Sequence, residues 1–151
     1  MRARRPVLSP FALILALVLP LAAAASAHED EKTLYQRLGG YDALAAVTDD
    51  FLGRFLGDEA LKRFFVGFST DSLNRIRQHV VDQLCQVTGG PCVYTGRDTK
   101  TSHAGIGITE ADWDATVAHL VATLDKFKVP HKEKDELLAL VSTLKADIVE
   151  K

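Results

Sequence analysis

The chain has 151 residues, of which 47% are apolar and 25% are charged, and its formal net charge is −2. This length fits one compact domain, and no run of lysine and arginine follows the first few residues. Because nucleic-acid binding needs a basic footprint, we expect no nucleic acid among the partners.

The first 27 residues have the three parts of a secretory signal peptide. A basic start holds three arginines, residues 11–25 are apolar apart from one proline, and Ala25-Ser26-Ala27 is a small-x-small cleavage site. A membrane anchor is the alternative, but a span needs about 20 apolar residues and this run is shorter. We therefore expect cleavage after Ala27, export to the periplasm and no membrane span in the mature protein.

Residues 28–32 are expected to form a flexible N-terminus, and residues 33–151 a single domain. Loss of the three leader arginines would shift the net charge from −2 to about −5. We expect this domain to act as a monomer.

Four amphipathic helices are predicted in the domain, because apolar residues recur three or four positions apart. Their apolar stripes are Leu44, Val47, Phe51 and Phe55; Leu73, Ile76, Val80, Leu84 and Val87; Trp113, Val117, Leu120, Leu124 and Phe127; and Leu137, Leu140 or Val141, Leu144 and Ile148. No segment of alternating polarity predicts a strand. The fold class is therefore predicted to be all-α.

Helix-breaking and capping residues bound these stripes. They are Gly39-Gly40 before the first helix, Gly89-Gly90-Pro91 after the second, Thr109 with Asp112 at the start of the third, and Pro130 at the start of the fourth. Thr109 and Asp112 have capping-box spacing, and proline suits the first turn of a helix.

Two features distinguish this pattern from a plain four-helix bundle. A short piece at residues 59–65 ends in Phe64-Phe65, between the first two long helices. The stretch at residues 89–107 is long and glycine-rich, and it contains His103. Connections of that length in a small domain usually carry function. A short helical turn within this one could aim His103 inward.

The two cysteines, Cys85 and Cys92, lie on either side of the Gly-Gly-Pro reversal. After export to an oxidising compartment they can pair. A chain that turns back at this point could bring the two Cα atoms within about 7 Å, the limit for a disulfide. Two unpaired buried thiols are the alternative.

The five histidines differ in what their positions predict. His28 is expected in the solvated tail, His119 as a hydrogen-bonded core residue, and His131 in an exposed first turn. No two histidines are spaced as in the helical zinc motif His-Glu-x-x-His. His79, which borders an apolar stripe, and His103 remain candidate ligands for iron or zinc.

Several motifs, taken in order, resemble those of the group I truncated haemoglobins, the small 2-on-2 globins. They are Leu34-Tyr-Gln-Arg-Leu-Gly-Gly40, Asp50-Phe51, Phe64-Phe65, Gly89-Gly90-Pro91, Tyr94-Thr-Gly-Arg97, Lys100-Thr-Ser-His103 and the segment from Trp113 through His119-Leu120. The resemblance covers residues 33 to about 150. It implies a two-over-two helical sandwich around haem b.

The resemblance also implies roles for individual residues. His103 matches the proximal histidine that bonds the iron, and Phe65 matches the phenylalanine that packs against the porphyrin. Arg75 matches a basic residue that can meet a haem propionate. Arg97 and Lys100 are looser candidates for the same charge pairing.

The sequence departs from the family pattern on the distal side of the haem. Many members place a tyrosine and glutamines where this chain has Leu52, Ile76 and Val80. An insertion of about three residues between Phe65 and Gly89 accompanies the change. Without those hydrogen-bond donors, bound oxygen would gain little polar stabilisation, so tight oxygen capture is not expected.

His79 matches a position where some members carry a second iron ligand. Coordination by two histidines would suit electron transfer or gated binding of small ligands. The alternative is that His79 faces solvent near a propionate. No histidine lies near Ala146, so a covalent link between histidine and haem is not expected.

The predicted function is a haem protein that binds oxygen or nitric oxide, with carbon monoxide as a further ligand. Redox chemistry at the same iron, such as nitric oxide oxidation or electron transfer with an unknown redox partner, is a related option. An alternative from a different functional class is a helical module without a cofactor, which binds a partner or a metal in the periplasm.

Overall fold

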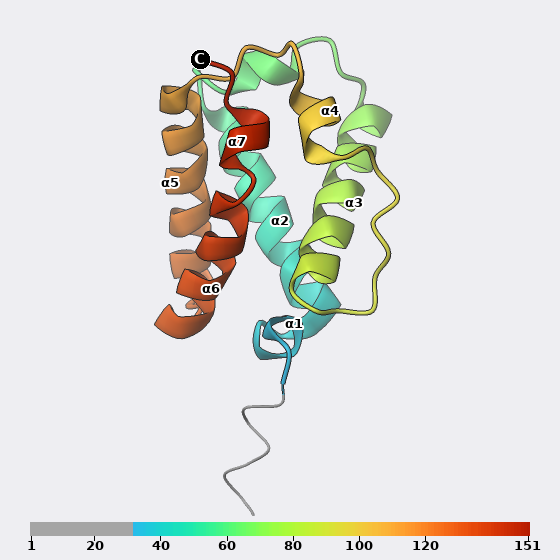
Figure 1. Ribbon diagram of the computed structural model, residues 1–151, viewed down its shortest axis with the longest axis vertical. Coiled ribbons are helices and arrows are strands. Elements are labelled where there is room, and N and C mark those ends of the chain that lie inside the picture. The colour runs from blue at the N-terminus through green and yellow to red at the C-terminus, as the bar shows by residue number, and fades with distance from the viewer. Residues whose placement is uncertain (1–31) are drawn as a thin grey trace, which may run out of the picture. The chain divides into compact units, whose positions relative to one another are not determined.

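The computed structural model describes residues 32–151. The predicted leader, residues 1–27, lies outside this part, and so do residues 28–31 of the predicted flexible N-terminus. The described part is helical and contains no strand, as the sequence predicts (Figure 1). No helix within residues 32–151 is both long enough and apolar enough to cross a membrane.

Two pairs of long helices make up the fold. The first pair is α2 (Gly40–Gly57) and α3 (Thr70–Val87), which pack against each other. The second pair is α5 (Glu110–Lys126) and α6 (His131–Ser142), which lie side by side (Figure 1). Because α2 also packs on α5, the pairs are stacked, which confirms the predicted two-over-two arrangement.

Four short elements complete the part of the chain from residue 32 to residue 151. They are α1 (Leu34–Arg37), the 3₁₀ helix η1 (Lys62–Phe65), α4 (Thr99–His103) and α7 (Lys145–Ile148). α1 packs on α2 and α6, whereas α4 packs on α7 (Figure 1). The short helix α4 therefore lies against the C-terminal segment of the chain.

The predicted helix boundaries are confirmed at three of the four long helices. α2 starts after Gly39, whose φ of 97° lies in the left-handed region that glycine favours. α3 ends before Gly89, whose φ is 84°. At the start of α5, Thr109 and Asp112 form both hydrogen bonds of a capping box.

The prediction of one continuous fourth helix through Ile148 is wrong. α6 ends at Ser142, and the separate helix α7 starts at Lys145. At the break, the backbone N–H of Thr143 donates to the carbonyl of Leu140, three residues back, at 3.2 Å. The Thr143 hydroxyl donates to the same carbonyl at 2.7 Å. Such local side-chain bonds compete with a regular helix.

The core lies where α1, α2, α5 and α6 meet. Its buried cluster is Leu34, Val47, Leu120, Leu124 and Leu137. Three residues of the predicted stripes are instead exposed, Val87 at 47%, Phe127 at 40% and Leu140 at 36%. Each stands in or just beyond the last turn of its helix, where the helical period no longer fixes which side faces the core. Of the predicted alternatives Leu140 and Val141, it is Val141 that packs on the core.

Cys85 and Cys92 are joined by a disulfide, with a separation of 5.7 Å between the two Cα atoms. This decides between the two alternatives that the sequence left open. The bridge ties the segment after α3 back to the last turn of that helix. Gly90 makes this path possible, because a Cβ there would lie 2.7 Å from the Sγ of Cys85.

Candidate functional site

His103 is the last residue of α4 and is half-buried. Its Nδ1 lies 2.7 Å from the backbone carbonyl oxygen of Thr99, four residues earlier on the same helix. Since a carbonyl can only accept, Nδ1 carries the proton and Nε2 keeps a free lone pair. In histidines that bind metals, a hydrogen bond from the ring nitrogen that does not contact the metal fixes the tautomer and the ring orientation. The bond to Thr99 can do this for His103.

The helix that carries His103 is held at its N-terminal end by side chains. Asp98 is the N-cap, and its carboxylate accepts from the backbone N–H and the hydroxyl of Thr101 at 2.8 and 2.7 Å. Gln83 of α3 donates to the hydroxyl of Thr99 at 3.3 Å. These contacts place the start of α4 beside α3.

His79 lies one helical turn before Gln83 on α3, is half-buried, and has a buried Nδ1 without a hydrogen-bond partner among the described residues. Its ring makes an edge contact with Tyr94, with 5.7 Å between the ring centroids. Tyr94 is itself fixed, because its hydroxyl donates to the carbonyl of Arg97 at 2.7 Å. A buried ring nitrogen without a partner is costly, so any rearrangement that gives this atom a partner would be favourable.

Apolar side chains come from three elements around these histidines. Leu52 lies on α2, Ile76 and Val80 lie on α3, and Phe65 ends η1; all four are half-buried. Phe65 packs edge-on against Phe55, with 5.3 Å between ring centroids. Half-buried apolar side chains from α2, η1 and α3, the helix of His79, can line a slot for a flat apolar group.

The three predicted cationic residues, Arg75, Arg97 and Lys100, are exposed. None of them forms an ion pair with another described residue. Arg97 and Lys100 flank the start of α4, whereas Arg75 lies on α3. The side chains of these three residues are therefore free to pair with an anionic group of a ligand.

His119 forms a hydrogen bond, as predicted, but its side chain is 26% exposed, so the prediction that it is a core residue is wrong. Nε2 of His119 lies 2.8 Å from the carboxylate of Asp58. The hydrogen bond from His119, followed by that from the Ala60 backbone, lowers the pKa of Asp58. His131 is exposed at the start of α6, and His28 lies outside the described residues.

Sequence reasoning gave no role to Thr99, Tyr94 or Glu150, although all three contact the site or its supports. The spacing of four between Thr99 and His103 is the one signal that could have indicated their hydrogen bond. Tyr94 and Glu150 contact residues that are distant in sequence, His79 and the glycines after α4. No periodic pattern in the sequence predicts such contacts.

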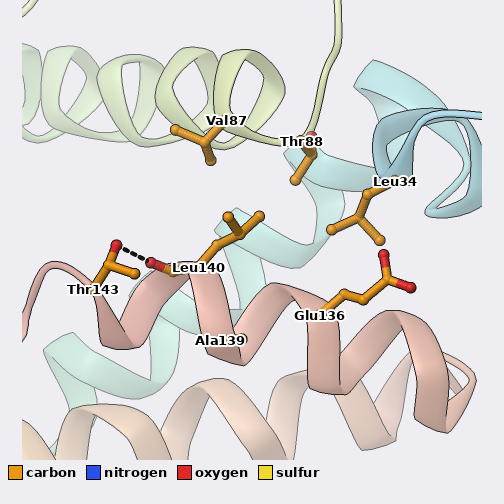
Figure 2. A pocket seen from close by; sticks show the side chains of 7 residues that line it. All are labelled: Leu34, Val87, Thr88, Glu136, Ala139, Leu140 and Thr143. Atoms are coloured by element: carbon orange, nitrogen blue, oxygen red, sulfur yellow. Dashed lines mark hydrogen bonds between the residues drawn. The ribbon is translucent and has the colours of Figure 1, made fainter.

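A cleft of about 410 Å³ lies nearby, between the end of α3, α1 and α6. It is lined by Leu34, Val87, Thr88, Glu136, Ala139, Leu140 and Thr143. Figure 2 shows the side chains of Val87 and Leu140 pointing toward each other across it. None of the predicted site residues lines this cleft. Val87 nevertheless follows Val80 by two turns, so the cleft adjoins the same apolar stripe of α3.

The comparisons with known proteins agree with this geometry. Residues 33–150 match the model of a family described as bacterial-like globin. The group 1 truncated haemoglobin GlbN of Mycolicibacterium paratuberculosis is 34% identical over 116 residues, which cover 77% of this chain and 83% of the relative. The group 1 truncated haemoglobin of Tetrahymena pyriformis is 30% identical over 120 residues, which cover 80% and 97%.

Solved structures are similar as well. The crystal structure of the truncated haemoglobin from Tetrahymena pyriformis in its Fe(III) form superposes with a TM-score of 0.73 at 29% identity. The 2/2 haemoglobin from Synechococcus, in the cyanomet state and with covalently attached haem, has a TM-score of 0.72 at 28% identity. Both comparisons cover 80% of this chain and 100% of the other.

Proposed function

This chain belongs to the bacterial-like globin family, and from that premise we propose that it binds haem b and takes a diatomic gas, oxygen or nitric oxide, at the haem iron. The proposal rests on the imidazole of His103, whose Nδ1 donates to the Thr99 carbonyl oxygen at 2.7 Å. Nε2 is thereby left as a nitrogen ligand of the kind that haem iron takes.

The other residues of the site fit the same group. Haem, when bound, supplies an iron that binds small gases and changes oxidation state. Phe65, Leu52, Ile76 and Val80 offer apolar contact to its ring. Arg75, Arg97 and Lys100 have no partner among the described residues and can pair with its propionates.

The apolar character of Leu52, Ile76 and Val80 has a consequence for the gas. None of these side chains can donate a hydrogen bond. A bound oxygen molecule would gain no polar stabilisation from them. We therefore expect weak retention of oxygen, and relatively better retention of a ligand that depends less on hydrogen bonds.

A second function is favoured by the buried, unpartnered Nδ1 of His79. With both His79 and His103 holding the iron, the protein would suit electron transfer or other redox chemistry, such as nitric oxide oxidation, and His79 would gate the binding of small gases.

Export to the periplasm belongs to the same proposal. The disulfide between Cys85 and Cys92 supports it, because disulfides persist in oxidising compartments and are rare in the cytosol. N-terminal sequencing of the secreted protein tests it, and a mature chain that starts at His28 is the expected result.

An absorption spectrum of the reduced protein, with and without carbon monoxide, tests the haem proposal. The purified protein should be red and show a Soret band that carbon monoxide shifts. His103→Ala should lose most of its haem, whereas the exposed His131→Ala is the matched control and should keep it. A colourless protein would favour the cofactor-free helical module, and full retention in His103→Ala would defeat the role of His103.

The redox proposal is tested by His79→Ala. With His79 on the iron, the ferrous wild type should show low-spin bands, which the substitution abolishes. The matched control is again His131→Ala, which should leave the bands unchanged. A wild type that is high-spin and five-coordinate would contradict ligation by His79 without affecting His103.

A further inference from the structure

We propose that Glu150 is a positioning residue for His103: its carboxylate clamps the loop that follows α4 and so fixes the orientation of the ligand ring. The inference rests on the proposed function, because it concerns the residue that would hold the iron. Glu150 lies near the end of the chain, 47 positions after His103, and the sequence alone assigns it no role.

The contact is a carboxylate held by two backbone donors. The N–H of Gly105 donates to Oε1 of Glu150, and the N–H of Gly107 donates to Oε2 at 2.7 Å. Backbone N–H groups that converge on one point form a concave site for an anion, and here the two donors are alternate residues of the loop. Here the anion comes from the chain itself.

The two glycines are needed for this loop shape. Gly105 has a φ of 80° and Gly107 a φ of 77°, which is the left-handed region that other residues rarely adopt. No heavy atom lies within 4 Å of where a Cβ would be at either position. The backbone conformation that points both N–H groups at Glu150 is therefore the reason for glycine, not a lack of space.

Glu150 is also held in place on its own side. Its backbone N–H donates to the carbonyl of Ile108 at 2.9 Å, and the N–H of Glu110 donates to the carbonyl of Lys151 at 3.1 Å. The preceding helix α7 packs on α4. The segment that carries the carboxylate is thus hydrogen-bonded to the backbone that follows the loop, at Ile108 and Glu110.

α4 depends on such support because it has only five residues. A helix of that length is not stable alone in water. Asp98 caps its N-terminal end, but after His103 the backbone of Ala104 leaves the helix at once with a ψ of 127°. The next fixed point is the N–H of Gly105 on Glu150, two residues after His103. Without it, the loop after His103 would keep the weak Ile106–His103 backbone bond at 3.3 Å, and α4 would keep its packing on α7.

The test compares Glu150→Ala and Glu150→Gln with Glu59→Ala in the haem-loaded protein. Glu59 is the matched control, because it is an exposed acid whose ion pair with Lys62, three residues later, lies on the surface. The first readout is the rate at which haem passes to an excess of apomyoglobin. The second is hydrogen exchange of the Gly105 and Gly107 amides, followed by NMR in the carbon monoxide complex and in the haem-free protein. The third is the fraction of the nitric oxide complex that loses the bond between iron and His103, measured by electron paramagnetic resonance.

Glu150→Ala should lose haem roughly tenfold faster, as expected for removal of a group that orients a metal ligand. Glu150→Gln should lie between, because an amide keeps one acceptor oxygen. Both glycine amides should exchange faster in the two variants, with or without haem, and more of the nitric oxide complex should be five-coordinate. Glu59→Ala should match the wild type in all three readouts.

The inference is overturned if Glu150→Ala loses haem no faster than Glu59→Ala while the wild type carries haem normally. It is also overturned if the Gly105 and Gly107 amides exchange at the wild-type rate in the haem-free variant. A wild type that takes up no haem at all would instead overturn the proposed function, and the amide readout would still report whether the clamp exists.

Discussion

The Asp50 carboxylate on α2 joins three partners from two helices. It accepts hydrogen bonds from Nε of Arg54 at 2.7 Å and the hydroxyl of Thr123 at 3.0 Å, and it also binds Nζ of Lys126. The hydrogen bond from Lys126, then that from Arg54, holds the pKa of Asp50 far below its ordinary value of 3.8. Because Lys126 and Thr123 lie on α5, the ionised carboxylate ties the two helix layers together.

We predict that this tie depends on pH in one direction. A carboxylate whose pKa is lower in the folded state stabilises that state above its unfolded pKa of 3.8, and the stabilisation is lost as the pH falls toward the folded pKa. Asp50→Asn should therefore lower the free energy of unfolding at neutral pH. The difference from the wild type should shrink steadily below about pH 4.

Urea unfolding at a series of pH values measures this difference. The matched control is Asp135→Asn on α6, an exposed carboxylate that makes no hydrogen bond to a described residue. It should change little at any pH. A difference for Asp50→Asn that grows on acidification would contradict the assigned cause.

The candidate site shows how far residue-level reasoning reaches. The place of His103 in a long glycine-rich connection made it one candidate beside His79, and the family resemblance is what singled it out. Its ring orientation could not be predicted, since it depends on the Thr99 carbonyl and on Glu150, 47 positions away in sequence. Contacts between distant segments follow from the fold, and local periodicity does not contain them.

At the scale of elements, boundary signals were more reliable than the extent of the apolar stripes. Glycine at positive φ and a capping box mark helix ends through local backbone chemistry, so Gly39, Gly89 and Thr109 could be read from the sequence. The end of α6 could not. Its stripe continues through Leu144 and Ile148, and the interruption comes from the Thr143 hydroxyl, which takes the Leu140 carbonyl in a way that the apolar pattern does not reveal.

The disulfide between Cys85 and Cys92 joins α3 to the connection that carries Tyr94. Cys85 is fully buried, and the closed loop spans seven positions of sequence. Chain entropy alone gives such a loop roughly 2 kcal/mol of stabilisation, because the cross-link restricts the unfolded chain. Cys92→Ser should therefore lower the free energy of unfolding by about 2 kcal/mol.

Urea unfolding of Cys92→Ser beside the oxidised wild type provides the measurement. The control is the wild type unfolded with a thiol reductant, which should lose a similar amount. A thiol assay of the unreduced, secreted protein should find no free thiol. Two free thiols, or equal unfolding midpoints, would contradict the bridge.

At the scale of the whole molecule, the two helix layers are joined unevenly. α2 packs on α5, and α1 packs on α6, so the layers meet closely on one side. On the other side, the hydrogen bond from Gln83 to the Thr99 hydroxyl at 3.3 Å joins α3 to α4. The apolar side chains of Leu52, Ile76 and Val80 remain half-buried there. Apolar surface that is left partly exposed is stabilised by any group that covers it.

We therefore predict that haem stabilises the folded state as a whole. A ligand that binds only the folded protein adds about 2.7 kcal/mol at a concentration of 100 times its Kd, which corresponds to a rise in Tm of roughly 10 °C for a domain of this size. Thermal unfolding of the haem-free protein, with and without free haem at about 100 times its Kd, measures the rise. His103→Ala keeps the apolar side chains but lacks the nitrogen ligand, so its rise should be much smaller. An equal rise in both proteins would mean that haem adheres to the apolar face without the bond from His103, and the site would then bind porphyrin without holding its iron.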